Sequence, residues 1–277
     1  MNHSTVEIPN FETLAIDLNQ HITHIQLNRP KSANAMNRAL WKELGDAMNW
    51  ADRTPEVRVV VLSGNGKHFC AGIDLAMLNE LIDDSITCEA RKRETLREEI
   101  LGLQRQLTSI EQCRKPVLAA IHGACIGGGV DMISACDMRY CTEDATFSVK
   151  EIDIGMVADV GTLQRLPSLI GDGLMRELAY TGRDVLGEEA RAIGLSNQCF
   201  KNKDAMMEAV FGIARAIASK SPLSIRGTKQ VLLYSREHSV ADGLDYIATW
   251  NAGMLMSDDL KVALDARRKN EVSDFEN

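Results

Sequence analysis

The chain has 277 residues, of which 45% are hydrophobic and 25% are charged, and its formal net charge is −8. This balance is typical of a globular protein, and the acidic charge argues against binding to nucleic acid, which needs lysine and arginine to neutralise phosphates. The seven cysteines form no CxxC pair and the six histidines show no metal-ligand spacing. We therefore expect buried, reduced thiols and no metal site.

Neither end of the sequence carries a recognisable targeting signal. Residues 1–11 lack a basic region followed by an apolar core, and residues 274–277 do not form a peroxisomal signal. No apolar run approaches the roughly 18 residues that a membrane span requires. We therefore expect a cytoplasmic protein that binds neither nucleic acid nor membrane.

The predicted elements alternate between strands and helices along residues 1–200. In chain order they are strands at 14–18 and 25–27, a helix at 37–52, a buried strand at 57–62, a charged helical region at 76–111, a second buried strand at 116–121, a helix from about 130 and a short strand at 138–140. This recurrence predicts an α/β core.

Residues 201–277 differ in character and predict a helical C-terminal region. Met206, Val210, Ile213 and Ile217 form a helical stripe, and Ser221 followed by proline is typical of the start of another helix. Residues 242–268 are predicted to form further helices. We expect this region to pack on the core or on a neighbouring subunit.

Two loops that follow the buried strands are candidates for binding an oxyanion. The first is residues 69–74, and the second is residues 124–129, which ends in three glycines. Glycine and other small residues let a ligand approach the backbone, and unpaired N–H groups in such turns can donate to an oxygen that gains negative charge. Each turn taken alone could instead be a tight connection between packed elements.

Three carboxylates after the glycines are candidate catalytic residues. Asp131 lies in the first turn of a predicted helix, where it could also simply complement the helix dipole. Glu151 and Asp159 stand among isoleucine, valine, methionine and alanine, and an apolar setting raises the pKa of a carboxyl and suits it to proton transfer. Asp153 is interpreted as an incidental solvated acid, and His122 as a hydrogen-bonded structural residue.

Taken together, these residues resemble the enoyl-CoA hydratase/isomerase family, also called the crotonase family. The matching segments are 28–31 with 34–36, then 69–74, 115–137 and 147–171. The resemblance covers nearly the whole chain, from about residue 12 to the C-terminal helices. It implies an α/β fold of the ClpP/crotonase type, a spiral of ββα units with a helical C-terminal trimerisation region.

The resemblance also implies a substrate and a site. The family binds acyl-CoA thioesters and forms homotrimers that often pair into hexamers, and it implies no metal or redox cofactor, because coenzyme A is part of the substrate. The N–H groups of Ile73 and Gly128 correspond to the family's oxyanion hole. The substrate-binding residues implied are Ala71, Gly72, Ile73, Asp74, Leu75 and Gly129.

The carboxylates indicate a branch of the family. Typical hydratases carry glutamates at the positions of Asp131 and Glu151 and a glycine-rich segment where Asp159 stands. The combination here looks like the Δ3,5-Δ2,4-dienoyl-CoA isomerase branch, in which the glutamate and the second aspartate move protons along a conjugated dienoyl chain. We therefore predict that Glu151 exchanges the C2 proton, Asp159 exchanges the C6 proton and Asp131 helps to hold the polar site.

Three alternatives remain open at this point. A 2-enoyl-CoA hydratase is the nearest, because a shorter acid at position 131 weakens water activation without abolishing it. A noncatalytic protein that binds acyl-CoA or RNA is another, although the acidic net charge disfavours RNA. A purely structural oligomer would leave the paired turns and the acids without a purpose.

Overall fold

The computed structural model describes residues 6–80 and 85–277, and its strands form two sheets. The larger has six strands in the order β1-β2-β3-β4-β6-β9, and the smaller has three in the order β5-β7-β8. Pairing is parallel except between β1 and β2 and between β7 and β8. The strands are β1 (Leu14–Asn19), β2 (Ile22–Leu27), β3 (Val59–Gly64), β4 (Val117–Ile121), β5 (Ala124–Ile126), β6 (Met138–Thr142), β7 (Thr146–Ser148), β8 (Val185–Leu186) and β9 (Gln198–Phe200).

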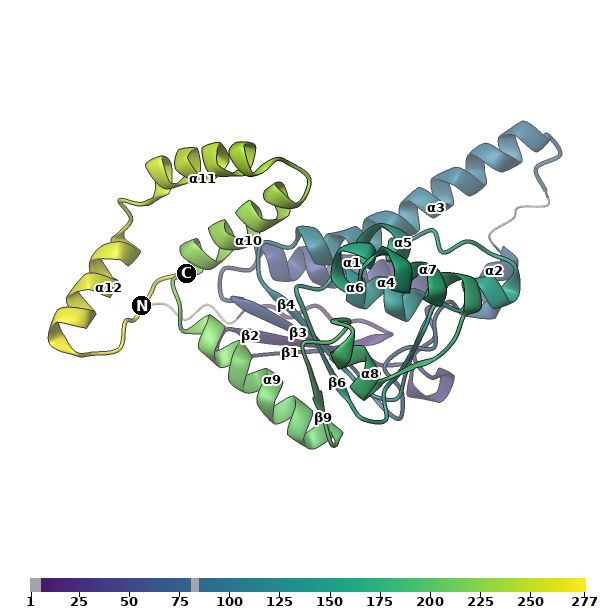
Figure 1. The fold of residues 1–277 in the computed structure, drawn as a ribbon, viewed down its shortest axis with the longest axis horizontal. Helices are drawn as coiled ribbons and strands as arrows, with labels where there is room; N and C mark the ends of the chain where they lie inside the picture. Colours follow the sequence, from purple (N-terminus) through teal and green to yellow (C-terminus); the bar gives the residue numbers. More distant parts are fainter. Residues whose placement is uncertain (1–5, 81–84) are drawn as a thin grey trace.

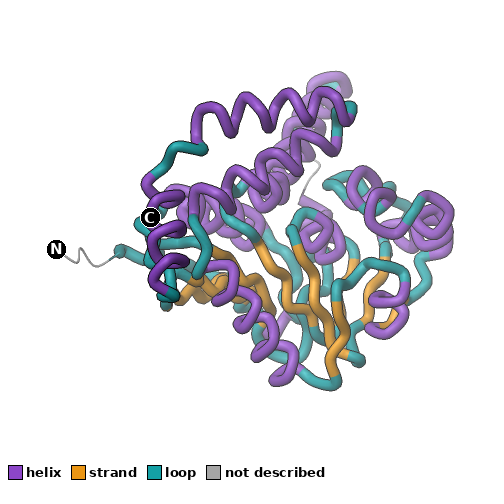
Figure 2. Tube along the Cα trace, turned by 60° about the vertical axis from the view of Figure 1, so that its left-hand side comes forward, coloured by secondary structure: helices purple, strands orange, loops and turns teal. Residues whose placement is uncertain are grey.

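Helices cover both faces of the larger sheet (Figure 1). They are α1 (Arg38–Arg53), α2 (Leu75–Glu80), α3 (Glu89–Gln112), α4 (Gly128–Ser134), α5 (Thr162–Arg165), α6 (Pro167–Ile170), α7 (Asp172–Thr181), α8 (Gly187–Ala192), α9 (Lys203–Ala218), α10 (Pro222–Arg236), α11 (Val240–Met254) and α12 (Asp258–Lys269), with short 3-10 helices η1 (Pro30–Ser32) and η2 (Glu151–Ile154). The tube view in Figure 2 shows the strands enclosed between these helical layers.

The central strand β3 is buried on both faces, as its β-branched sequence predicts. Val60 and Leu62 pack in the larger apolar cluster, which includes residues of α1 and α3. Val59 and Val61 point to the opposite face and pack in a second cluster with residues of α9. Alternate side chains of one strand thus anchor two helical layers, which fixes the sheet as the middle layer of the core.

Some boundaries differ from the sequence-based predictions. The helical region predicted at 76–111 contains two helices, α2 and α3, and residues 81–84 of that prediction lie outside the described residues. Helix α4 begins at Gly128 rather than near residue 130, because the glycines form its first turn. Helix α11 begins at Val240 rather than at residue 242, because Ser239 and Asp242 form a capping box.

The predicted helical C-terminal region is confirmed as α9 to α12. Helix α9 packs on the larger sheet, whereas α10, α11 and α12 extend beyond it and curve round at one end of the molecule (Figure 1). Helices α10 and α11 pack closely, and the rings of Tyr234 and Tyr246 stack at 4.1 Å. The division of the chain into regions 1–200 and 201–277 stays a prediction.

The cysteines are free, and five of them are buried: Cys70, Cys113, Cys125, Cys136 and Cys141. Cys199 is half-buried and Cys88 is exposed, so the prediction of buried thiols holds for most of the set. Across the described part of the chain, no helix combines the length and apolarity that crossing a bilayer would require.

Candidate active site

The two small-residue loops predicted from the sequence lie side by side. Cys70 and Cys125 form a parallel bridge, in which the Cys70 N–H donates to Ala124 O and the Ile126 N–H donates to Cys70 O, both at 2.9 Å. A Cβ added to Gly72, whose φ is +90°, would lie 2.9 Å from Ile126 O. Glycine is therefore required where the first loop passes the second.

Two unpaired backbone donors converge where these loops meet. Met36 pairs with the residues on either side of Ile73, and this pattern leaves the Ile73 N–H without a partner. Gly128 is the first residue of α4, where helical N–H groups have no intrahelical acceptor. Within residues 6–80 and 85–277 neither N–H has a hydrogen-bond acceptor. A Cβ added to Gly128 would lie 3.8 Å from the Ile73 nitrogen, so both donors border one small space.

The Asn34 side chain holds the first loop in place, and sequence reasoning missed it. Asn34 is fully buried, with a positive φ of 55°. Its Nδ2 donates to the carbonyl oxygens of Asn65, His68 and Phe69 at 2.9, 2.9 and 3.1 Å. Its Oδ1 accepts from the Arg29 N–H at 2.8 Å. One amide thus fixes the path of the chain from the end of β3 to the Ile73 donor.

A cavity of about 170 Å³ lies in front of the two donors. Most of the predicted site residues line it: Ala71, Gly72, Ile73, Leu75, Gly128, Asp131, Glu151 and Asp159. Asp74 instead forms an ion pair with Arg29 at 3.1 Å, and Gly129 packs against Cys70. These two do not line the cavity, and their contact with substrate stays a prediction.

The structure adds lining residues that the sequence did not single out, including Trp41 of α1 and Ile100 and Leu103 of α3. Trp41 is 3% exposed, and its Nε1 has no partner in the described residues. Leu96, Ile100, Leu103 and Leu107 recur at helical spacing, so the apolar stripe of α3 was a visible signal in the sequence. Nothing in the local sequence distinguishes Trp41 from an ordinary core residue.

Glu151 lies directly behind the glycine turn. It is the first residue of η2, and its Oε1 would be 3.0 Å from a Cβ on Gly127, whose φ is +50°. Burial, together with the neighbouring negative charge of Asp131, raises the pKa of Glu151 from 4.5 to about 7. Its Oε2 is buried without a partner in the described residues. A carboxyl with this pKa can gain or lose a proton near neutrality.

Asp131 is fully buried and tied to the segment that carries Asp159. Its Oδ1 accepts the backbone N–H of Thr162 at 2.6 Å, and its Oδ2 has no partner in the described residues. Burial raises the pKa of Asp131 to about 6, although the hydrogen bond from Thr162 acts in the opposite direction. The carboxylate therefore fastens two parts of the site and adds negative charge to it.

Asp159 is half-buried and borders the same cavity as Glu151. Burial raises its pKa above the ordinary value. By contrast, the side chain of Asp153 is 52% exposed and pairs with Lys150 at 3.4 Å, which agrees with its interpretation as a surface acid. The structure thus separates the two cavity acids from Asp153, which the sequence setting alone does not, because Asp153 lies between two isoleucines.

His122 lies outside the cavity lining and has a structural environment. Its ring Nε2 lies 2.9 Å from Gly66 O, in agreement with its predicted structural role. The described residues include no group of three histidines, cysteines or acids arranged to hold a metal ion. The expectation that no cofactor is needed stays a prediction.

Comparison with known proteins identifies strong similarities along most of the chain. The model of the enoyl-CoA hydratase/isomerase family matches residues 17–270. A protein of Arabidopsis thaliana, named peroxisomal Delta(3,5)-Delta(2,4)-dienoyl-CoA isomerase, is 50% identical over 93% of this chain and 94% of its own. A human protein, named mitochondrial Delta(3,5)-Delta(2,4)-dienoyl-CoA isomerase, is 47% identical over 94% of this chain and 80% of its own.

The fold is also similar to solved structures. The crystal structure of an enoyl-CoA hydratase from Bacillus anthracis superposes with a TM-score of 0.85, at 29% identity, and covers 96% of this chain and 99% of that one. The predicted α/β spiral with a helical C-terminal region is thereby confirmed. The cytoplasmic location stays a prediction, since the two named relatives are peroxisomal and mitochondrial.

Proposed function

The chain belongs to the enoyl-CoA hydratase/isomerase family, and from that premise we propose that it isomerises a 3,5-dienoyl-CoA to a 2,4-dienoyl-CoA. The observation that carries the proposal is the group of three carboxylates, Asp131, Glu151 and Asp159, around a cavity that begins at two unpaired N–H groups. The relatives at about half identity, all named as dienoyl-CoA isomerases, support the same reaction.

The N–H groups of Ile73 and Gly128 bind the thioester oxygen in this proposal. Loss of the C2 proton converts the thioester to an enolate, and two donors fixed before the reaction stabilise the developing negative charge. Removal of one such donor in other enzymes costs roughly 3–4 kcal/mol of transition-state stabilisation. This electrostatic contribution is the largest that we assign to the site.

Glu151 and Asp159 move the protons. Glu151 takes the proton from C2, the electrons shift along the conjugated chain, and Asp159 donates a proton to C6. The active enzyme therefore holds one proton between these two carboxyls. Asp131 is not required to exchange protons with substrate, because one of its oxygens holds the Thr162 N–H. The substrate supplies its own coenzyme A, and we propose that no other cofactor is needed.

Substitution of each acid tests these roles. Glu151→Gln and Asp159→Asn should each reduce turnover of 3,5-dienoyl-CoA by at least about 100-fold, the lower range for loss of a general acid or base. The appearance of 2,4-dienoyl-CoA, whose diene is conjugated with the thioester carbonyl, is followed by absorbance. Asp153→Asn, a change on the exposed neighbour of Glu151, is the matched control and should retain the wild-type rate. Near wild-type turnover in either site variant would contradict the assignment.

Hydration of a 2-enoyl-CoA is the second candidate, favoured by a 33% identical relative named crotonyl-CoA hydratase. The two reactions differ in product mass, since isomerisation leaves it unchanged and hydration adds one water. From 3,5-dienoyl-CoA we expect a product of unchanged mass whose diene is conjugated with the thioester carbonyl. Fast hydration of 2-enoyl-CoA with no dienoyl product would reverse the choice.

We also propose that the chain forms homotrimers, alone or paired into hexamers. The C-terminal helices expose apolar side chains, among them Val240 (80%), Leu244 (64%) and Met256 (85%), and large exposed apolar patches mark interaction surfaces. Leu244→Lys should reduce the mass measured by light scattering, whereas Leu186→Lys, at a site 57% exposed outside this region, should not. A monomeric wild-type protein would contradict the proposal.

A further inference from the structure

The backbone that carries Asp159 is fastened to α3 by side chains that do not line the proposed substrate cavity. We call residues 159–161 the Asp159 loop. Gln104 Nε2 donates to the backbone oxygen of Asp159 at 2.6 Å. The guanidinium of Arg165 lies against Gly161, where an added Cβ would be 1.8 Å from Arg165 Nη1. Gly161 has a φ of +136°, so glycine is required for this close approach.

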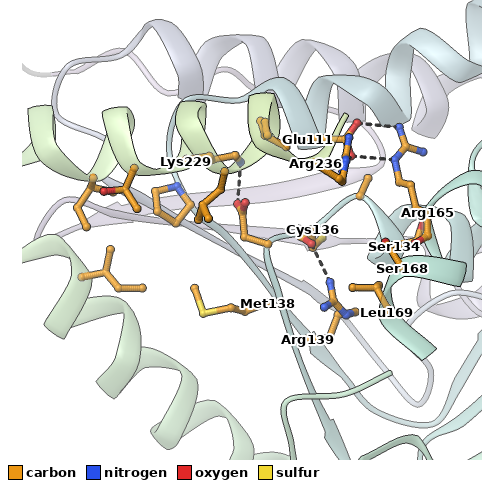
Figure 3. A pocket seen from close by; sticks show the side chains of 18 of the residues that line it. Glu111, Ser134, Cys136, Met138, Arg139, Arg165, Ser168, Leu169, Lys229 and Arg236 are labelled. Carbon is orange, nitrogen blue, oxygen red and sulfur yellow. Dashed lines mark hydrogen bonds and ion pairs between the residues drawn. The ribbon is translucent and has the colours of Figure 1, made fainter. Parts of the chain in front are cut away.

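Arg165 is held in turn by a carboxylate shared with the C-terminal region (Figure 3). Glu111 at the end of α3 accepts hydrogen bonds from Arg165 Nε at 3.2 Å and Nη2 at 3.3 Å. The same carboxylate accepts a hydrogen bond from Arg236 Nη1 of α10 at 2.6 Å. Figure 3 shows the two guanidinium groups meeting at the one carboxylate, with α3 and α10 on either side.

The Glu111–Arg165 pair of this cluster is sheltered from solvent, whereas Arg236 is partly exposed. The side chains of Glu111 and Arg165 are 14% and 12% exposed, and that of Arg236 is 40% exposed. Burial alone would raise the pKa of Glu111, but hydrogen bonds from both arginines more than offset it, and the pKa lies below the ordinary value. Charge-assisted bonds with this burial hold their geometry better than exposed surface pairs do.

The cluster and the Asp159 loop also border a common cavity. A space of about 570 Å³ is lined by Gln104, Glu111, Asp159, Arg165 and Arg236, and it shares Asp159 and Val160 with the cavity lined by Glu151. Asp159 is therefore the acid that borders both spaces. On the side away from substrate its position is set by α3 directly, and by α10 through Glu111.

We propose that Gln104 and the Arg165–Glu111–Arg236 cluster are positioning residues for Asp159, which make proton delivery at C6 depend on how α10 is seated. This inference rests on the proposed isomerase function. In that reaction the C2–H bond breaks and its proton goes to Glu151. The double bonds then move from C3–C4 and C5–C6 to C2–C3 and C4–C5, as a C6–H bond forms with the proton of Asp159. Displacement of the Asp159 loop affects this last transfer most directly.

Two variants test the proposal, one on each support of the loop. Gln104→Met keeps the length of the side chain but removes the donor to Asp159 O, and Arg236→Met removes the link from α10. Arg114→Met, which removes an ion pair with Asp52 outside the site, is the matched control. Asp159→Asn serves as the reference for complete loss of the C6 step.

Each protein is assayed in D₂O for two rates, the formation of 2,4-dienoyl-CoA and the uptake of deuterium at C2 of the recovered substrate. Both support variants should lower kcat for isomerisation by roughly 10- to 100-fold, the loss that follows from misplacing a reacting group by about 1 Å. Their C2 exchange should persist, as in Asp159→Asn, and their KM should change little. Arg114→Met should match the wild type in both rates.

The ratio of C2 exchange to isomerisation decides the result. A ratio that stays at the wild-type value in both support variants would overturn the proposal, whether both rates fall together or neither falls. A failure of the proposed function is recognised separately, because the wild-type protein would then form no 2,4-dienoyl-CoA. Rescue of isomerisation by Arg236→Lys, which restores a cation beside Glu111, would support the positioning role further.

Discussion

Replacing Asp131 with asparagine removes one negative charge from a fully buried site and keeps the shape of the side chain. The asparagine oxygen can still accept the hydrogen bond from the Thr162 N–H, which Asp131 Oδ1 accepts at 2.6 Å. Burial raises the pKa of Asp131 from 3.8 to about 6 in the folded protein. The folded state therefore binds this proton more tightly than the unfolded chain does, and stability falls as pH rises from about 4 to about 6.

The size of the effect follows from that shift. A difference of about two pKa units corresponds to about 3 kcal/mol, at 1.36 kcal/mol for each unit. Above about pH 6 the wild-type protein is destabilised by the full free energy of ionising the buried Asp131 carboxyl, whereas Asp131→Asn has no carboxyl to ionise at this position. The variant should therefore gain about 3 kcal/mol in free energy of unfolding relative to the wild type between about pH 4 and pH 7. The direct effect of the new amide group on the free energy of unfolding does not depend on pH.

Urea denaturation at several pH values, at a fixed protomer concentration, measures this difference. Asp245→Asn, at an exposed position of α11, is the control and should give a difference that does not vary with pH. A constant difference between Asp131→Asn and the wild type would refute the reasoning, since it would mean that burial does not hold this carboxyl in its protonated form. The same variant should lose much less isomerase activity than Glu151→Gln.

Three further predictions follow from the site. The value of kcat/KM for isomerisation should pass through a maximum with pH, because Glu151 and Asp159 together hold one proton in the active enzyme. It should decline above the raised pKa of Glu151, about 7. In Asp131→Asn this decline should begin at lower pH, because a negative charge beside Glu151 is gone. A profile without an upper limb would contradict this assignment. Gly127→Ala should lower kcat by roughly 100-fold, because its methyl group would displace the Glu151 carboxyl, whereas Gly173→Ala, where a Cβ meets nothing within 4 Å, should leave kcat unchanged. Asn34→Ala should lower the free energy of unfolding by about 3 kcal/mol or more in urea titrations, since three carbonyl oxygens lose their donor; a loss no greater than that of the exposed Asn49→Ala would be inconsistent with this network.

Much of the fold follows from local patterns in the sequence. The β-branched residues of β3 predict burial on both faces, and the apolar stripe that begins at Met206 predicts α9. The division between α2 and α3 was not predicted, because charged and apolar residues continue at helical spacing across it. In the structure α3 begins after Cys88, whose backbone is extended with ψ at 113°, although no proline or glycine marks this start in the sequence.

The candidate site was predictable where chemistry and spacing coincide. Glycines after two buried strands indicated the paired loops. Apolar neighbours favoured Glu151 and Asp159, but they did not exclude Asp153, which lies between Ile152 and Ile154. Contacts between side chains distant in the sequence were not predictable. The bond from Gln104 to Asp159 O spans 55 residues, and the amide of Asn34 reaches the chain 31 to 35 residues away. Such contacts depend on tertiary packing, for which a single sequence carries no periodic signal.

The two donors of the proposed oxyanion site are main-chain groups of Ile73 and Gly128, and this has a consequence for how the protein can change over generations. Ordinary amino-acid replacements alter side chains but leave the amide hydrogen in place, and only proline removes it. Most substitutions at these two positions thus leave the hydrogen-bond donors for a thioester oxygen in place. The carboxyl groups are side chains and are lost when their residues are substituted. A new reaction can therefore arise from substitutions at positions 131, 151 and 159 while the backbone donors stay the same.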